Sequence, residues 1–323
     1  MPYGGSAAKV TIAEVQSEFL QALQAQEDLA GLIADTKPST RKSEKFVVVG
    51  SPSILQEWTD ERVDQDVFET DLTVTPRHYE AMEKVHRDSL EDDQTGAYME
   101  NVRGLAGAVV LHRNNLVLGD LLDAMYSDGN YGLAWDGQFF FDTDHSDPGP
   151  ATYTTSWDND LTGAAATGTT PTEAEVHTAL DAIEEAFMLK KDDKGRPYHG
   201  GALASLPRVI VAPPDLYGPI VRAVNNTWFP VSGGPIENVN RKGLYRVVAN
   251  QYTANADRFQ VFLGTKAALI VQRLAARFQQ VTGMRSGEVS HETFIRLFDY
   301  FGVDYRIRPA LRHFAYACSY IYT

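Results

Sequence analysis

The chain has 323 residues, 43% of them hydrophobic and 22% charged, an ordinary globular composition that suits one large unit or two modest domains. Its formal net charge of -14 argues against a broad basic surface that would bind nucleic acid by neutralising phosphates, although a local basic patch stays open. A single cysteine, Cys318, excludes a disulfide within the chain and fits a reducing cytoplasm best, and we find neither a signal peptide nor an apolar run of the roughly 18 residues that span a bilayer.

The N-terminal region carries an amphipathic helical pattern from Thr11 to Asp35, and Pro38 then interrupts it. The apolar residues recur at helical spacing and are Ile12, Val15, Phe19, Leu23, Ala30 and Ile33. The pattern predicts an amphipathic helix joined to the rest of the chain by a polar segment.

Extended segments follow. Lys45–Val49 predicts a strand, and Val67–Thr75 alternates apolar and polar residues with the period of a half-buried strand. Tyr79–Arg87 fits either a helix or a strand, and we interpret it as a strand. Residues 44–88 would then form a long hairpin. Because an isolated two-stranded ribbon is only marginally stable in water, this hairpin must lean on another surface.

The next 80 residues predict one long helix and then mostly irregular structure. Apolar residues form a helical stripe from Asp92 to Tyr126, and the acidic cluster Glu91–Asp93 suits the positive end of the helix dipole. Gln138–Phe141 predicts a short aromatic strand, and Ser146–Thr169 is a loop rich in glycine, alanine and threonine.

The C-terminal half mixes helices and strands. Thr170–Glu173 predicts a helix start with a capping box, and a second helix is expected from Pro214 to about Asn225. A polar excursion follows over residues 225–243. Strands are predicted at 208–212, 244–249, 259–263, 268–271, 294–308 and 314–322. This order, with few regular βαβ units, indicates an α+β fold.

One tight cluster contains metal-capable side chains, namely Asp142, Asp144, His145 and Asp147. Metal-dependent hydrolases use such groups, but we favour a polar turn capped by its own aspartates, because no second His/Asp cluster at a recognisable spacing accompanies them. We therefore predict no metal, no cofactor and no catalytic residue.

Other chemistry-bearing residues receive structural interpretations. Cys318 is expected to face the core of a strand, and His112 is expected to be a satisfied or surface histidine. The run Lys190–Lys194 suits the negative end of a helix dipole and needs no ligand. No phosphate-binding glycine motif occurs.

Six segments, taken in their order and spacing, resemble the major head subunit of Mu-like phages from about Asp35 to the C-terminus. They are Phe46–Arg62, Arg87–Tyr98, Trp135–His145, Asp192–Asp215, Gly243–Gly264 and Phe301–Arg306. Ser146 departs from the family pattern, where a proline is expected, and the loop from Ala151 to Thr169 is particular to this chain.

The resemblance implies the Hong Kong 97-type capsid fold. Its expected parts are an N-terminal arm over residues 1–43, an E-loop hairpin over 44–90, a P-domain over 91–165 and an A-domain over 166–284 and 310–323. The P-domain would be built on a spine helix at 92–126, and residues 285–309 would return to it.

The resemblance further implies a major capsid protein and not an enzyme. It would assemble in the host bacterial cytoplasm, as hexamers and pentamers, into the icosahedral head of a tailed phage virion. Expected partners are other copies of itself, a scaffolding protein, a portal and a decoration protein, with packaged double-stranded DNA touched only by weak non-specific contact. Because no long scaffold segment precedes the fold, the scaffolding protein and a protease are expected to be separate.

The expected contact residues fall in three elements. The E-loop set is Phe46, Val48, Trp58, Arg62, Phe68, Leu72 and Val74, the arm set is Ile12, Val15, Phe19 and Leu23, and the capsomer-axis loop set is Asn226, Trp228, Phe229 and Asn238. Two alternatives stay open: an encapsulin-like compartment shell that holds cargo protein, and a soluble metal-dependent hydrolase.

Overall fold

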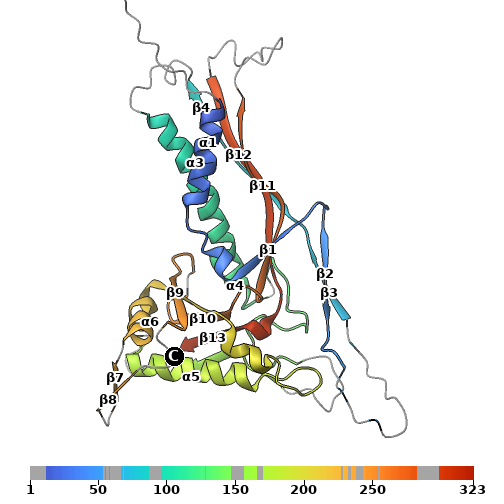
Figure 1. The fold of residues 1–323 in the computed structure, drawn as a ribbon, viewed down its shortest axis with the longest axis vertical. Helices are drawn as coiled ribbons and strands as arrows, with labels where there is room; N and C mark the ends of the chain where they lie inside the picture. Colours follow the sequence, from blue (N-terminus) through green and yellow to red (C-terminus); the bar gives the residue numbers. More distant parts are fainter. Residues whose placement is uncertain are drawn as a thin grey trace, which may run out of the picture.

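The computed structural model of the chain describes residues 12–53, 55, 58, 67, 69–86, 96–127, 129–146, 156–165, 170–226, 228–231, 234–237, 243–253, 255–281 and 298–323. Within this part the molecule is elongated (Figure 1). Long helices and long strands run side by side through one end, and a second sheet with two helices forms the other end. A separate two-stranded ribbon stands beside them. The expected α+β class is confirmed.

The spine of the elongated end is a long helix that begins after Gly96. α3 (Ala97–Asn115) continues through a π-helical turn at Leu116–Leu121 into α4 (Leu122–Ala124). Gly96 has a φ of 73°, a left-handed backbone that a right-handed helix cannot contain, so the helix starts later than the predicted Asp92. The acidic cluster expected at its start lies outside the described residues.

The N-terminal helix α1 (Ile12–Ala25) packs against α3 of its own chain. The prediction of one helix as far as Asp35 is wrong beyond Ala25. A short 3-10 turn, η1 (Ala30–Leu32), follows, and the chain then enters strand β1 (Ala34–Pro38). Ala30 and Ile33 are buried, as their apolar character predicts, but they lie in and beside a turn and not in an α-helix. Tertiary pairing of β1 therefore overrides the local helical pattern.

The long sheet contains four strands in the order β1-β11-β12-β4. β11 (Ala268–Val281) and β12 (Phe298–Leu311) pair antiparallel along their length, and β1 joins β11 in parallel. β4 (Arg77–His86) pairs antiparallel with β12. Phe278, Phe301, Val303, Tyr305 and Ile307 of this sheet belong to the main hydrophobic core. The long strands thereby give α3 an apolar surface to lie on.

The second sheet has five strands in the order β5-β13-β10-β6-β9. Their bounds are Asp160–Gly163 for β5, Ala317–Tyr322 for β13, Arg258–Leu263 for β10, Arg208–Ala212 for β6 and Tyr245–Ala249 for β9. β6 and most of β10 are buried throughout, as a central strand requires. Helices α5 (Glu173–Leu189) and α6 (Pro214–Asn225) pack beside it.

A capping box starts α5, with its N-cap at Thr172 instead of the predicted Thr170. The Glu175 backbone N–H donates to Thr172 Oγ1 at 3.3 Å, and the Thr172 backbone N–H donates to Glu175 Oε2 at 2.7 Å. Both Thr170 and Thr172 have an acidic residue three positions later, so the sequence pattern fits either register. The structure uses the second of them.

The predicted long hairpin over residues 44–88 is corrected. β2 (Glu44–Val49) pairs with β3 (Glu69–Val74) as a two-stranded ribbon, whereas β4, correctly interpreted as a strand, leaves the ribbon and joins the long sheet. Pro76 separates β3 from β4 at this change of direction. A second small hairpin lies within the predicted polar excursion and consists of β7 (Trp228–Val231) and β8 (Gly234–Glu237).

The predicted strand at Gln138–Phe141 is also wrong. This segment is irregular, and the Phe141 backbone N–H donates to the Met125 carbonyl oxygen at 2.9 Å instead of joining a sheet. Phe140 and Phe141 are both almost fully buried. Their burial, rather than a strand, accounts for the aromatic run. Short 3-10 turns occur at η3 (Gly200–Ser205) and at η4 (Phe314–Tyr316), which links β12 to β13.

Candidate functional site

One face of the ribbon packs against its own chain. A small core fills the space between the ribbon and the long sheet and consists of Val74, Leu269, Val271 and Ala310. Phe46 and Leu72, which are partly buried, pack against this core. Val48, only 9% exposed, lies in the same row of β2 as Phe46. Phe46, Val48, Leu72 and Val74 were expected to contact a neighbouring copy. In this structure Phe46, Leu72 and Val74 pack toward their own sheet, and the expected contact with a neighbouring copy stays a prediction.

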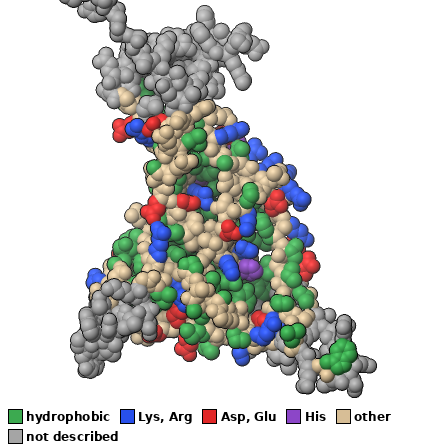
Figure 2. Space-filling view, in the orientation of Figure 1, with side chains coloured by type: hydrophobic (Ala, Val, Ile, Leu, Met, Phe, Trp, Pro, Cys, Tyr) green, Lys and Arg blue, Asp and Glu red, His purple; other side chains and the backbone are tan. Residues whose placement is uncertain are grey.

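The opposite row of the ribbon is exposed. Val47 and Val49 are 48% and 59% exposed, and they pair across the ribbon with Asp71 and Glu69. Figure 2 shows hydrophobic and charged side chains together on the flank where the ribbon lies. We call this row, Val47 and Val49 with Glu69 and Asp71, the outer row of the ribbon. It is the apolar surface that the single chain leaves uncovered among the described ribbon residues.

Further apolar side chains lie beyond the paired part of the ribbon. Leu55 is fully exposed, Trp58 is 67% exposed and Val67 is 46% exposed. The expected contact role of Trp58 stays a prediction. Arg62 and Phe68 lie outside the described residues.

The sequence contains a signal that both faces of β2 are apolar. Three consecutive valines, Val47–Val49, place apolar side chains on both sides of the strand, because successive residues point to opposite faces. Periodicity in β3 identified one row, but it could not tell which row meets the body, since that depends on tertiary packing.

The N-terminal helix is held by its own chain. Phe19 is fully buried, and its ring lies 5.4 Å from that of Phe278 in β11. Leu23 is partly buried against the same core, and Arg103 of α3 pairs with Glu18. Phe19 is therefore a core residue of the single chain, and its expected contact with another copy stays a prediction. The side chains of Ile12 and Val15 lie outside what the structure describes.

The segment expected at the capsomer axis begins in an ordered contact. The Asn226 Nδ2–H donates to Glu173 Oε2 at 3.1 Å, and Arg222 Nε lies 3.2 Å from Glu173 Oε1. These contacts tie the end of α6 to the start of α5. Trp228 and Phe229 lie in β7, where the structure describes only the backbone, and Asn238 lies outside the described residues. Their expected role stays a prediction.

The candidate metal cluster is a structural element around His145. His145 is fully buried, its Nδ1 lies 2.6 Å from Asp136 Oδ2, and its Nε2 lies 3.1 Å from the Phe140 carbonyl oxygen. Its ring stacks on Phe314 at 3.8 Å. Both ring nitrogens are thus engaged by protein oxygens, which leaves neither lone pair to bind a metal.

Two aspartates of the same cluster hold local turns. Asp142 Oδ2 accepts a hydrogen bond from the Phe139 backbone N–H, and Asp144 Oδ1 accepts one from Gln138 Nε2. Asp147 lies outside the described residues. Among the residues that the structure does describe, no group of three or more His, Cys, Asp or Glu side chains is placed to hold a metal ion.

Cys318 is buried in β13, as predicted, and burial raises the pKa of its thiol. His112 is a structural histidine whose Nδ1 contacts the Tyr305 hydroxyl. The run Lys190–Lys194 begins at the end of α5, as predicted, and most of it is buried. Lys190 is 2% exposed, and its Nζ lies 5.0 Å from the centre of the Trp157 ring.

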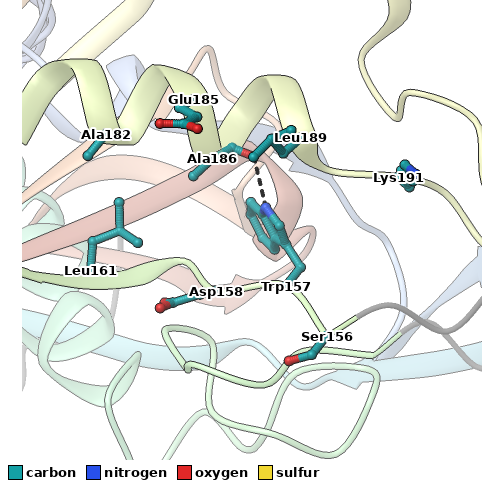
Figure 3. A pocket seen from close by; sticks show the side chains of 9 residues that line it. All are labelled: Ser156, Trp157, Asp158, Leu161, Ala182, Glu185, Ala186, Leu189 and Lys191. Atoms are coloured by element: carbon teal, nitrogen blue, oxygen red, sulfur yellow. Dashed lines mark hydrogen bonds between the residues drawn. The ribbon is translucent and has the colours of Figure 1, made fainter.

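A cavity of about 440 Å³ lies between α5 and the segment before β5 (Figure 3). Trp157, Leu161, Ala182, Ala186 and Leu189 supply its apolar surface. The Trp157 indole Nε1–H donates to the Ala186 carbonyl oxygen at 2.8 Å and so fixes one wall. The remaining lining residues are Ser156, Asp158, Glu185 and Lys191. This lining contains neither histidine nor cysteine.

Nor does any helix among the described ranges combine the length and the apolar character needed to cross a membrane. The projecting ribbon, with its exposed outer row, is therefore the candidate functional surface.

Comparison with solved structures supports the fold. The chain is similar to the procapsid of bacteriophage JBD30, with a TM-score of 0.52 and 18% identity over 96% of this chain and 73% of that one. It is similar to the capsid of the cyanophage P-SCSP1u, with a TM-score of 0.60 and 12% identity over 92% and 89% of the two chains. A virus-like particle from Pyrococcus furiosus gives a TM-score of 0.54 at 8% identity, over 95% and 98%. The expected Hong Kong 97-type capsid fold is confirmed.

Sequence comparison places the chain more narrowly. The Mu-like prophage FluMu major head subunit of Haemophilus influenzae is 28% identical over 113 residues, which are 35% of this chain and 35% of that protein. The alignment thus spans about a third of the curated relative. The family described as Mu-like prophage major head subunit gpT matches residues 9–171, just over half of the chain. The chain therefore belongs to the Mu-like prophage major head subunit family.

Proposed function

We propose that this chain is a major capsid protein, which self-assembles into the icosahedral head that encloses the double-stranded DNA of a tailed phage. Family membership favours this function. The structural observation that carries it is the projecting ribbon, whose outer row leaves Val47 and Val49 about half exposed in the single chain. A subunit that works alone gains nothing from holding an apolar row in water, whereas a subunit that binds its own copies covers it.

The ribbon and the surface that it meets would be different patches of the same subunit. Such heterologous contacts generate rings and closed shells when the rotation between copies allows closure. Burial contributes about 0.8 kcal/mol per CH2 group, so each ribbon supplies a modest free energy. Several modest contacts per subunit sum to a stable shell, while each contact alone can still dissociate and correct an error during growth.

We assign the parts of the fold as follows. Residues 1–43 form the N-terminal arm, the ribbon with the residues that connect β2 to β3 is the E-loop, and the five-stranded sheet with α5 and α6 is the A-domain. β4 and β11 go with the P-domain, because they share one sheet with β12. This moves β4 and β11 across the boundaries expected from the sequence. The β7–β8 hairpin and Asn226 would lie toward the capsomer axis.

The role would be structural rather than catalytic. Partners would be further copies in hexamers and pentamers, a separate scaffolding protein, a portal and a decoration protein, in a head that is built in the host bacterial cytoplasm and becomes part of the virion. A net charge of -14 would keep contact with packaged DNA weak and non-specific. No membrane partner is proposed.

The test is the particle itself. The full chain, purified and analysed by size-exclusion chromatography with light scattering and by electron microscopy, is expected to yield closed shells of megadalton mass. A small oligomer under every assembly condition would overturn the proposal. Shells from an infected or induced host that contain cargo protein instead of DNA would favour the encapsulin-like alternative.

A deletion addresses the ribbon separately. Replacing residues 54–67 by a short Gly/Ser linker removes the exposed end and leaves β2, β3 and β4 intact, since β4 belongs to the long sheet. This variant is expected to fold but not to close shells. Normal closed shells would refute the role of the ribbon.

A further inference from the structure

Two contacts between the ribbon and the rest of its chain, both among the described residues, lie far apart along β2. The first is the small core where Val74 meets the long sheet. The second lies past the end of β2, where the Ser51 backbone N–H donates to Asp193 Oδ1 at 3.1 Å. Beside it, Arg196 NH2 donates to the Pro52 carbonyl oxygen at 2.9 Å. Both residues of the body belong to the turn that follows α5.

This turn is built around buried charge. Asp192, Asp193 and Lys194 are 6%, 4% and 6% exposed, although a turn of this kind needs only small or polar residues at the surface. Asp192 accepts hydrogen bonds from the Lys194 N–H at 3.0 Å, the Arg196 N–H at 2.8 Å and Arg196 Nε at 2.9 Å. Gly195, with a φ of 79°, closes the turn.

These contacts give the turn a second structural role besides reversing the chain, namely to hold the ribbon. Burying ionised groups is unfavourable unless each one is paired and hydrogen-bonded. Asp192 is saturated by the turn itself and thereby orients the Arg196 guanidinium. Asp193 presents one acceptor to the ribbon, and Arg196 NH2, which also lies 2.8 Å from Asp192 Oδ2, presents one donor. We call Asp193 and Arg196, with Asp192 beneath them, the socket.

The socket recognises the backbone of the ribbon and not its side chains. It binds the N–H of Ser51 and the carbonyl oxygen of Pro52. Ser51 precedes a proline, which restricts its backbone to extended conformations, and the ring of Pro52 fixes its own φ. The two groups that the socket binds are therefore held in a narrow range of geometries before contact.

We propose that the socket fixes the direction in which the ribbon projects, and so positions the outer row for contact with the next copy. This rests on the proposed capsid function. Glu44, opposite Val74 at the base of the ribbon, and Ser51 are seven residues apart, about 23 Å at the rise of a strand. A ribbon held only at its base could swing, whereas a second attachment at that distance defines its angle. Asp193 and Arg196 are thus positioning residues for assembly.

Three variants separate the positioning role from a general effect on stability. Asp193→Ala removes the acceptor for Ser51, whereas Asp193→Asn keeps an oxygen in the same place and serves as the conservative control. Arg196→Lys keeps a positive charge near Asp192 but lacks the fork that reaches Asp192 and Pro52 together. Asp215→Asn, at the exposed start of α6, controls for the loss of an acidic charge elsewhere.

The first measurement does not depend on shells. Spin labels are placed at Leu55→Cys on the ribbon and Leu111→Cys on α3, which are 100% and 59% exposed, while the native Cys318 is buried and stays unlabelled. Labelled full-length chain is diluted into unlabelled chain, and the distance distribution is measured by pulsed EPR. We expect a narrow distribution for the unaltered chain, Asp193→Asn and Asp215→Asn, and a broad one for Asp193→Ala and Arg196→Lys. Amide exchange at Ser51 should rise about tenfold in Asp193→Ala.

The second measurement is particle geometry by electron microscopy. Asp193→Ala and Arg196→Lys are expected to give open or irregular particles, and Asp193→Asn closed ones. Narrow distributions with normal shells in both disruptive variants would overturn the socket, and so would irregular particles with a ribbon that stays fixed. Failure of the unaltered chain to form shells would overturn the proposed function alone. If Asp193→Ala loses its folded circular dichroism, Arg196→Lys decides the outcome.

Discussion

Replacing the two outward valines of the ribbon, Val47 and Val49, by alanine tests the outer row with little disturbance of the folded chain. Both side chains are about half exposed, so the free energy of unfolding should change little. Each substitution removes two carbon atoms, worth about 0.8 kcal/mol each when fully transferred out of water. Only the part still exposed in the monomer, 59% for Val49 and 48% for Val47, remains to be buried by a neighbour. The contact between copies therefore loses roughly 1.7 kcal/mol in the double variant.

That loss has a measurable consequence. With one ribbon per subunit, roughly 1.7 kcal/mol raises the critical concentration for assembly about twentyfold, since 1.4 kcal/mol corresponds to a factor of ten. Light scattering of a concentration series of purified chain, scored by electron microscopy, measures it. Leu111→Ala on α3 is a matched control, because Leu111 is as exposed as Val49 and lies away from the ribbon. An unchanged critical concentration in the Val47→Ala, Val49→Ala variant would refute the reasoning, as would an equal shift in the control.

Three further outcomes follow from buried side chains. Phe19→Ala should lower the free energy of unfolding in urea by about 3–5 kcal/mol, because the ring is fully buried beside Phe278, and a loss below about 1 kcal/mol would contradict its place in the core. Burial, reinforced by nearby cations such as Lys266, lowers the pKa of both His199 and His313 to about 4. Since the folded chain then favours the neutral rings, stability is complete above pH 6.5 and falls as the pH drops from 6.5 toward 4. Urea midpoints from pH 7 to pH 4 should show this decline, and His199→Phe should reduce it; an equal decline in that variant would argue against the assignment. Cys318 should react with a thiol reagent only after unfolding, and rapid reaction of the folded chain would contradict its burial.

The sequence predicts well those elements whose pattern and packing agree. α5, α6 and β6 lie close to their expected places, because strong local signals such as a capping box, a proline near the first helical turn and a short apolar run coincide with burial in the second sheet. The resemblance to known head subunits also anticipated the family. Local and global preferences point the same way in these regions.

The errors arise where tertiary structure decides. β1 begins within the predicted helical pattern, which extends to Asp35. It is nevertheless a strand, because it pairs in parallel with the edge of β11. The sequence does not decide which row of the ribbon meets the long sheet, since valines occupy both faces of β2. Lys190 lies at the predicted helix end, but its burial beside Trp157 and Phe314 was not predicted. The aromatic rings that interact with its ammonium group are distant in sequence, so the local pattern around Lys190 cannot predict this contact.

The packing of α1 changes the physical account of assembly. A chain whose arm and ribbon were both unsatisfied would have to order both on binding, and each ordered residue opposes association with about 1–2 kcal/mol of conformational entropy. Here Phe19 anchors the described part of the arm in the core, and the inner row of the ribbon lies on its own sheet. The described parts of the arm and the ribbon are therefore already ordered within the single chain, and under the proposed function the outer row would meet a neighbour as a preformed surface. Preorganisation of this kind lets a small apolar row contribute most of its burial free energy to binding.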